Sequence, residues 1–192
     1  GGLSLGLQQA GFEPVFAADF DRHACSTYAR NLGAHVHNID LARVEPEALA
    51  DLVAKECGSV DVVAGGAPCQ GFSVQRRGAL IDARNDLVLR FAKFATTLNP
   101  QAILLENVPT ILGHRGKAYI ERVAQEWDAA GYEVHRAVLE AASHGVPQFR
   151  RRAFVVGIRR DLGAQFRFPT PSLKPSQYVT VRDAIGNMPP PP

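Results

Sequence analysis

A short apolar run that ends in a glycine-rich turn with a cysteine constrains the fold of this chain more than any other feature. Residues 60–64 (VDVVA) predict a buried parallel strand, which the small residues 65–67 end. Cys69 then lies at the carboxyl end of a strand, the edge of an open α/β sheet where ligands bind. Pro68 fixes one backbone torsion before the cysteine, so the turn can hold the thiol in one direction.

A thiol at such a turn is a candidate nucleophile. The thiolate is the attacking species, and the free group is mostly protonated near neutral pH, so its surroundings must favour ionisation. The alternative is a buried structural cysteine, which is the expectation for Cys25 and Cys57.

The next apolar run repeats this arrangement. Residues 101–105 (QAILL) predict a strand that ends in Glu106 and Asn107, before a turn marked by a proline. If the two strands are neighbours, Cys69 and Glu106 share one crevice. A nucleophile beside an acid suits addition to an electron-poor ring, in which attack at one atom is helped by a hydrogen bond to another. Taken alone, Glu106 also fits an acid at a helix N-terminus or a solvated loop residue.

Three consecutive arginines precede the last apolar run, residues 153–158. In an extended segment Gln148, Arg150 and Arg152 share one face. Planar guanidinium groups suit phosphate oxygens and base carbonyls, so this face could contact a nucleic acid. An edge strand with a solvated run of charge is the alternative interpretation.

Together these three stretches resemble the signature of the C5-cytosine DNA methyltransferases. The shared motifs are Pro-Cys-Gln-Gly-Phe-Ser at 68–73, Glu-Asn-Val at 106–108 and Gln-x-Arg-x-Arg at 148–152, and the resemblance spans essentially all 192 residues. It implies an α/β fold of the Rossmann-like S-adenosylmethionine-dependent methyltransferase type, with a mostly parallel sheet. It also implies a DNA (cytosine-5-)-methyltransferase that acts on a flipped base.

The resemblance assigns roles to individual residues. Cys69 would add to C6 of the cytosine, and Glu106 would hydrogen-bond the N3 edge. Arg150 and Arg152 would hold the base carbonyl or its phosphate, and C5 would receive the methyl group of S-adenosyl-L-methionine. The residues expected to contact substrate or DNA are Gln70, Ser73, Asn107, Gln148, Arg150 and Arg152.

The cofactor site is expected to begin at the first residues of the chain. Gly1 and Gly2 match the last two glycines of the family's Phe-x-Gly-x-Gly-Gly motif, so the first strand of the fold is expected to be absent from this sequence. Asp19 ends a predicted strand about twenty residues beyond them, the separation at which a nucleotide-binding unit places a carboxylate on ribose hydroxyls. The expected cofactor residues are Gly1, Gly2, Leu3, Asp19, Phe20, Asn38, Ile39, Pro68 and Leu87.

Two positions near this site keep alternative roles. Asp21 is also suited to cap the helix that follows it. Relatives usually have aspartate where this chain has Asn38, whose amide oxygen can still accept a hydrogen bond from the adenine amino group. Asp40 is the alternative acceptor.

The chain divides into two regions by composition. Residues 1–165 are expected to form the catalytic and cofactor-binding domain, truncated at its N-terminus. The proline-rich residues 166–192 are expected to form a linker toward an absent target-recognition region. The first part of residues 74–87 is polar and contains glycine, which predicts a loop that closes over a substrate, and a helix is expected to follow through Leu98.

Charge and cysteine usage limit the other classes of function. The net charge is only +2, but arginines gather at 76–77, 150–152 and 159–160, which favours a phosphate-facing edge on a near-neutral body. Three cysteines without paired spacing and six scattered histidines argue against a disulfide framework or a metal site. No apolar stretch approaches the ~20 residues of a membrane span. We expect a monomeric, cytoplasmic protein whose partner is double-stranded DNA.

Two alternative functions stay open from the sequence. One is a cytosine-5 tRNA methyltransferase of the same general kind, although Gly71 favours DNA because those relatives tend to have proline after Cys-Gln. The other is a non-catalytic fragment that binds DNA or cofactor without turnover, which the missing first strand would favour.

Overall fold

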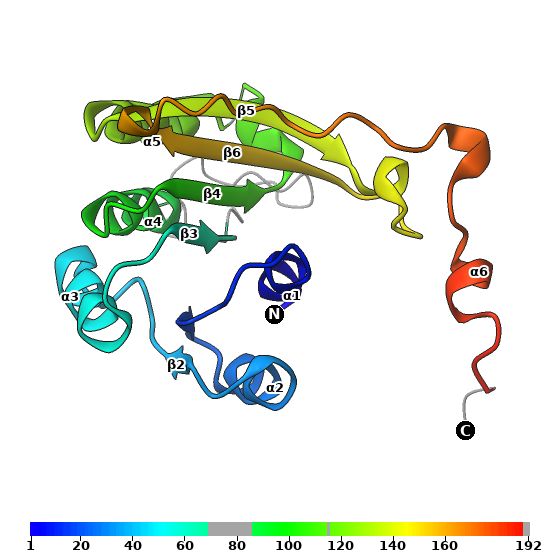
Figure 1. The fold of residues 1–192 in the computed structure, drawn as a ribbon, viewed down its shortest axis with the longest axis horizontal. Coiled ribbons are helices and arrows are strands. Elements are labelled where there is room, and N and C mark those ends of the chain that lie inside the picture. Colours follow the sequence, from blue (N-terminus) through cyan, green and yellow to red (C-terminus); the bar gives the residue numbers. More distant parts are fainter. Residues whose placement is uncertain (69–85, 115, 190–192) are drawn as a thin grey trace.

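The chain forms an α/β fold in the computed structural model, which describes residues 1–68, 86–114 and 116–189 (Figure 1). In chain order, its α-helices and strands are α1 (Gly2–Gln9), β1 (Ala17–Asp19), α2 (Arg22–Leu32), β2 (Val36–Asn38), α3 (Pro46–Cys57), β3 (Val62–Gly65), α4 (Asp86–Thr97), β4 (Ala102–Asn107), α5 (Lys117–Ala129), β5 (Tyr132–Glu140), β6 (Arg151–Arg159) and α6 (Val181–Ile185). Short 3-10 turns lie between them at η3 (Pro109–Leu112), η4 (Ala141–His144), η5 (Arg160–Leu162) and η6 (Pro175–Gln177).

The helices of the first half begin and end at residues suited to those positions. The carboxylate of Asp21 caps α2 by accepting hydrogen bonds from the backbone N–H groups of His23 at 2.7 Å and Ala24 at 3.1 Å. Proline occupies the first turn of α3, where its missing N–H has no helical partner to lose. The same helix ends at Gly58, whose φ of 72° favours glycine.

The strands form two separate sheets. β1 and β2 pair in parallel, and the larger sheet has the order β3-β4-β6-β5. β3 and β4 are parallel, whereas β6 runs antiparallel to both β4 and β5. Among the described residues no strand joins β1 to β3, and Figure 1 shows the two sheets apart.

The hydrophobic core lies between the larger sheet and the helices α4 and α5. Along β4 the side chains alternate, and those of Ile103 and Leu105 are fully buried. Trp127 of α5 is also fully buried, and its indole N–H donates to the backbone oxygen of Ala92 in α4. Full burial of each large apolar side chain stabilises the fold by roughly 1.5–3 kcal/mol. The helix α1 contributes no buried residue to this core.

The C-terminal segment first follows the sheet and then leaves it. Phe166 packs on His135 of β5 with ring centroids 5.3 Å apart. The backbone N–H groups of Ser172 and Leu173 donate to the carbonyl of Ser143 at 3.0 Å each. Contact with the domain therefore extends past residue 165, and only the later part, with α6, stands away from the sheet in Figure 1. Within the described ranges, no helix combines the length and apolar character that a membrane crossing requires.

Candidate active site

The carboxyl ends of β3 and β4 lie at the same edge of the larger sheet, as the sequence predicts. The two strands pair in parallel, with Gly65 opposite Leu105. Just beyond this pair, the side-chain amide of Asn107 donates to the backbone oxygen of Ala67 at 3.0 Å, and its amide oxygen accepts from the N–H of Val108 at 2.8 Å. Asn107 is only 5% exposed, so this amide ties the two strand ends together inside the protein.

Glu106 and Arg152 form an ion pair at this edge. The antiparallel register places Glu106 opposite Phe154, and Arg152 therefore lies where β6 passes the carboxyl end of β4. The Nε of Arg152 and the Oε1 of Glu106 are 2.8 Å apart, and the two side chains are 24% and 29% exposed. The pair is thus accessible from outside but is partly withdrawn from water.

The carboxylate of Glu106 also lies over the glycine turn that follows β3. A Cβ atom built on Gly66 would be 3.4 Å from the Oε2 of Glu106. The acid therefore lies between Gly66 on one strand end and Arg152 on the other. A group approaching this turn would meet a carboxylate that is already oriented by a guanidinium group.

Cys69, Gln70 and Ser73 lie outside the described residues. Pro68, the residue before Cys69, is the last described position of the turn and is exposed. The convergence of the thiol and the acid on one base stays a prediction, which is supported by the position of the turn beside Glu106.

Gln148, Arg150 and Arg152 do not share one face of a regular strand. β6 begins only at Arg151, and Gln148 lies in a bend where its N–H donates to the backbone oxygen of Val146. Arg150 is exposed, and both of its backbone groups are bound: its N–H donates to the carboxylate of Glu140 at 2.8 Å, and its oxygen accepts from Ala141. Glu140 therefore has a structural role that no motif in the sequence indicates.

A large cavity lies between the two sheets. Its volume is about 700 Å³, and its walls come from the β1 side, the β3 strand and the first turns of α4. Five of the nine expected cofactor residues line it, namely Asp19, Phe20, Ile39, Pro68 and Leu87. Gly1, Gly2, Leu3 and Asn38 are not among the lining residues, although Ser4 and Leu7 of α1 are.

The acids at the end of β1 have separate partners. One carboxylate oxygen of Asp19 accepts a hydrogen bond from the N–H of Asp21 at 2.9 Å, and the other has no hydrogen-bond partner in the described part of the chain. The backbone N–H groups of Ala24 and His23 hold the pKa of Asp21 below its usual range, because they stabilise its charged form. Asp21 is therefore the helix cap, and Asp19 is the carboxylate at the cavity wall.

Asn38 connects the ends of β1 and β2. Its side-chain nitrogen donates to the backbone oxygens of Asp19 at 3.0 Å and Phe20 at 2.8 Å. An aspartate could not make these two bonds, because an ionised carboxylate has no proton to donate. The amide oxygen then points away from both carbonyls and finds no donor among the described residues, so it remains free to accept one.

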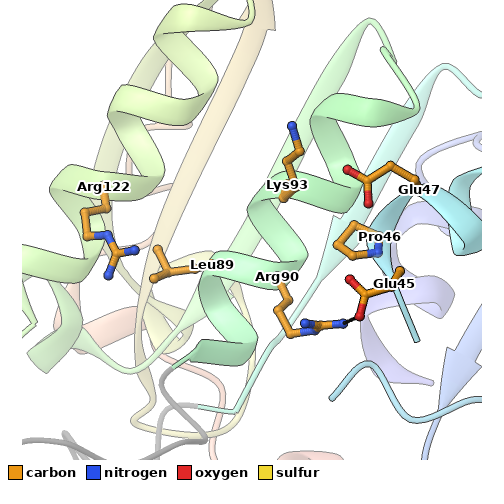
Figure 2. Close-up of a pocket in the computed structure, with 7 residues that line it drawn as sticks. All are labelled: Glu45, Pro46, Glu47, Leu89, Arg90, Lys93 and Arg122. Carbon is orange, nitrogen blue, oxygen red and sulfur yellow. Dashed lines mark ion pairs between the residues drawn. The ribbon is translucent and has the colours of Figure 1, made fainter. Parts of the chain in front are cut away.

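A second, more open cavity has a different character. Its volume is about 520 Å³, and it lies where the start of α3 faces α4 and α5 (Figure 2). It is lined by Glu45, Pro46, Glu47, Leu89, Arg90, Lys93 and Arg122, none of which is a predicted site residue. Within the part of the chain that the structure describes, no group of acidic, histidine and cysteine side chains is suited to hold a metal ion.

Comparisons with known proteins agree with this geometry. The family model of the C-5 cytosine-specific DNA methylases matches residues 1–191. The chain is 36% identical to the Type II methyltransferase M.NgoFVII of Neisseria gonorrhoeae over 98% of this chain and 51% of that protein. It is 34% identical to the Type II methyltransferase M.AquIA of Picosynechococcus sp., with coverage of 99% of this chain and 86% of that protein.

A solved structure is similar over the same extent. It is a prophage-encoded protein of E. coli, solved as a candidate DNA modification methyltransferase, with a TM-score of 0.82 and 30% identity over 98% of this chain and 52% of its own. This chain spans about half the length of several of the curated relatives that it matches. The matched family model and the paired strand ends lead to one conclusion: the chain belongs to the C-5 cytosine-specific DNA methylase family.

Proposed function

We propose that this chain is the catalytic and cofactor-binding part of a DNA (cytosine-5-)-methyltransferase that acts on double-stranded DNA. The observation that carries the proposal is the Glu106–Arg152 ion pair beside the turn that leads to Cys69. A carboxyl group fixed at this position suits a ring nitrogen, and a thiol on the neighbouring strand end suits a ring carbon.

The chemistry of cytosine requires such a pair. C5 is a poor nucleophile while the ring is aromatic, so a group must first add at C6. The Cys69 thiolate forms a bond to C6 while the Glu106 carboxyl, in its protonated form, donates a hydrogen bond or its proton to N3 and so draws electron density from the ring. S-adenosylmethionine supplies the methyl group that C5 receives. Loss of the C5 proton then returns the electron pair to the ring and expels the thiolate of Cys69.

The surrounding residues serve this chemistry by holding its parts in place. Arg152 orients the Glu106 carboxylate at 2.8 Å. Asn107 contributes by tying the ends of β3 and β4 together through its buried amide, and its contact with DNA stays a prediction. Arg150 is exposed toward solvent and suits a phosphate oxygen.

The cavity between the sheets suits S-adenosylmethionine by its chemistry. Asp19 offers a carboxylate for ribose hydroxyls, and Phe20, which is 71% exposed, offers a ring face for the adenine. The amide oxygen of Asn38 suits the adenine amino group, but Asn38 does not line the cavity whereas Asp40 does, so Asp40 remains the alternative acceptor. Asp40 has its own partners, since its carboxylate accepts from the N–H of Ala42 and pairs with Arg43.

The test is methyl transfer by the protein expressed from its complete reading frame. Tritium should pass from labelled S-adenosylmethionine to duplex DNA, and Cys69→Ser should abolish transfer while cofactor binding stays within about twofold. Glu106→Gln should slow the chemical step more than it weakens DNA binding. A serine variant with a comparable rate would eliminate Cys69 as the nucleophile, and transfer to tRNA instead of DNA would overturn the substrate assignment.

A further inference from the structure

Arg90 of α4 donates hydrogen bonds to the segment that follows β2. Its Nε donates to the backbone oxygen of Leu41 at 2.7 Å, and a terminal nitrogen donates to the backbone oxygen of Val44. The same side chain lies 3.5 Å from a carboxylate oxygen of Glu45, as Figure 2 shows. These partners are 46 and 49 residues away in sequence, in the segment that follows β2.

The two elements that Arg90 joins form opposite walls of the large cavity. Ile39, Asp40 and Leu41 line it from the β2 side, and Leu87 and Phe91 line it from α4. Arg90 is not among the residues that line this cavity and lines the smaller one instead. It therefore holds the two walls together from outside the cavity.

The contacts of Arg90 indicate that its hydrogen bonds to the backbone matter more than its ion pair with Glu45. Glu45 is 73% exposed, so its attraction to Arg90 is screened by water. The side chain of Arg90 is only 28% exposed, and its planar guanidinium group donates to the backbone oxygens of both Leu41 and Val44.

We propose that Arg90 is a positioning residue that sets the width of the cofactor cavity by fixing residues 41–44 to α4. The inference rests on the proposed cofactor. Arg90 touches neither cofactor nor DNA, and it acts through Ile39, Leu41 and Leu87, whose places it determines. Loss of its hydrogen bonds lets residues 39–41 move away from α4 and lowers the affinity for the cofactor.

The experiment measures cofactor affinity by calorimetry in the protein from the complete reading frame, with S-adenosylhomocysteine as the probe. Arg90→Ala should raise its Kd about tenfold, the equivalent of about 1.4 kcal/mol. Arg90→Lys should fall short of rescue, because an ammonium group cannot bridge both carbonyls in one plane. Glu45→Ala, which removes only the ion pair, and Lys93→Ala, a matched cation on the same helix, should each stay within about twofold.

Two further readouts separate positioning from general loss of structure. The Kd for duplex DNA and the saturated rate of methyl transfer should stay within about twofold in Arg90→Ala, while the KM for S-adenosylmethionine rises with the Kd. Amide hydrogen exchange should accelerate in residues 39–45 and not in β5 or β6. Parallel losses of cofactor affinity, DNA affinity and unfolding temperature would make Arg90 merely structural.

Other outcomes also overturn the inference. An unchanged Kd in Arg90→Ala, or equal losses in Arg90→Ala and Glu45→Ala, would show that the backbone bonds do not set the cavity. If the wild-type protein binds no S-adenosylhomocysteine, the cofactor assignment in the proposed function fails. The positioning of residues 41–44 would then stand or fall on the hydrogen exchange alone.

Discussion

The Glu106–Arg152 ion pair gives a quantitative prediction for the substitution Arg152→Ala. The change removes the guanidinium that meets the carboxylate at 2.8 Å and leaves an acid whose side chain is 29% exposed. Glu106 then loses its fixed orientation but keeps access to water, which limits the cost of leaving it unpaired.

The magnitude follows from distance and exposure. At 2.8 Å and an effective dielectric constant of about 20, the Coulomb attraction alone is about 6 kcal/mol. Desolvation and loss of side-chain freedom offset most of it, and a hydrogen bond to a charged group contributes about 1.5–3 kcal/mol net. Because both partners are about one quarter exposed, the lower figure applies, and it corresponds to about a tenfold loss in the rate of the chemical step.

The assay is single-turnover methyl transfer to duplex DNA, with DNA affinity measured on the same preparations. Arg152→Ala should lower the single-turnover rate constant about tenfold. Arg152→Lys should restore part of that rate constant, because lysine keeps the positive charge but lacks the planar set of donors of arginine. Arg136→Ala is a suitable control, because Arg136 is an exposed arginine in the middle of the adjacent strand β5. This control should leave the rate unchanged.

One pattern of results would refute the reasoning. If Arg152→Ala weakened DNA binding while the rate constant at saturating DNA stayed at the wild-type value, Arg152 would be a ligand for DNA only. The resting ion pair with Glu106 would then have no part in orienting the acid.

Three further predictions concern stability and strand geometry. Gly65→Ala should destabilise the protein by about 1–3 kcal/mol in urea unfolding, because the new Cβ would lie 2.4 Å from a ring atom of the buried Phe91; Gly6→Ala, which meets nothing within 4 Å, should be neutral or stabilising. Burial raises the pKa of Tyr132, so the folded state keeps the phenol proton to higher pH than the unfolded chain, and stability should fall as pH rises above about 10. Tyr132→Phe should remove that fall in a pH series of thermal unfolding. Asn107→Ala and Asn107→Asp should both cost about 1–3 kcal/mol in chemical denaturation, since neither side chain can donate to the strand end before Pro68, and full rescue by aspartate would contradict this.

Much of the fold could be predicted from local pattern. The apolar runs that end at Gly65 and at Asn107 are the strands β3 and β4, and they are neighbours in parallel register. Such runs, bounded by glycine and proline, carry their own strand signal. The strand predicted to end at Asp19 is present as β1, which covers only Ala17–Asp19 and pairs with β2.

The details that depend on distant partners could not be predicted. The expectation that Gln148, Arg150 and Arg152 share one extended face was wrong, because the chain bends at Gln148 and Glu140 fixes the backbone of Arg150. In the sequence, Arg90 resembles any solvated residue on an amphipathic helix. The partners of Arg90 are backbone oxygens, which every residue has, so the sequence does not indicate which residues it contacts.

The three arginines at this edge of the sheet, Arg150, Arg151 and Arg152, differ in their surroundings because β6 passes the end of β4 in the antiparallel direction. Arg152 is neutralised by Glu106, whereas the side chains of Arg150 and Arg151 are exposed and form no ion pair among the described residues. Long-range capture of a polyanion therefore depends on these outer two, and added salt would screen it. Arg152 acts only at contact distance, because Glu106 neutralises its charge. Higher ionic strength would therefore slow the association with a polyanion and leave the rate of the chemical step unchanged.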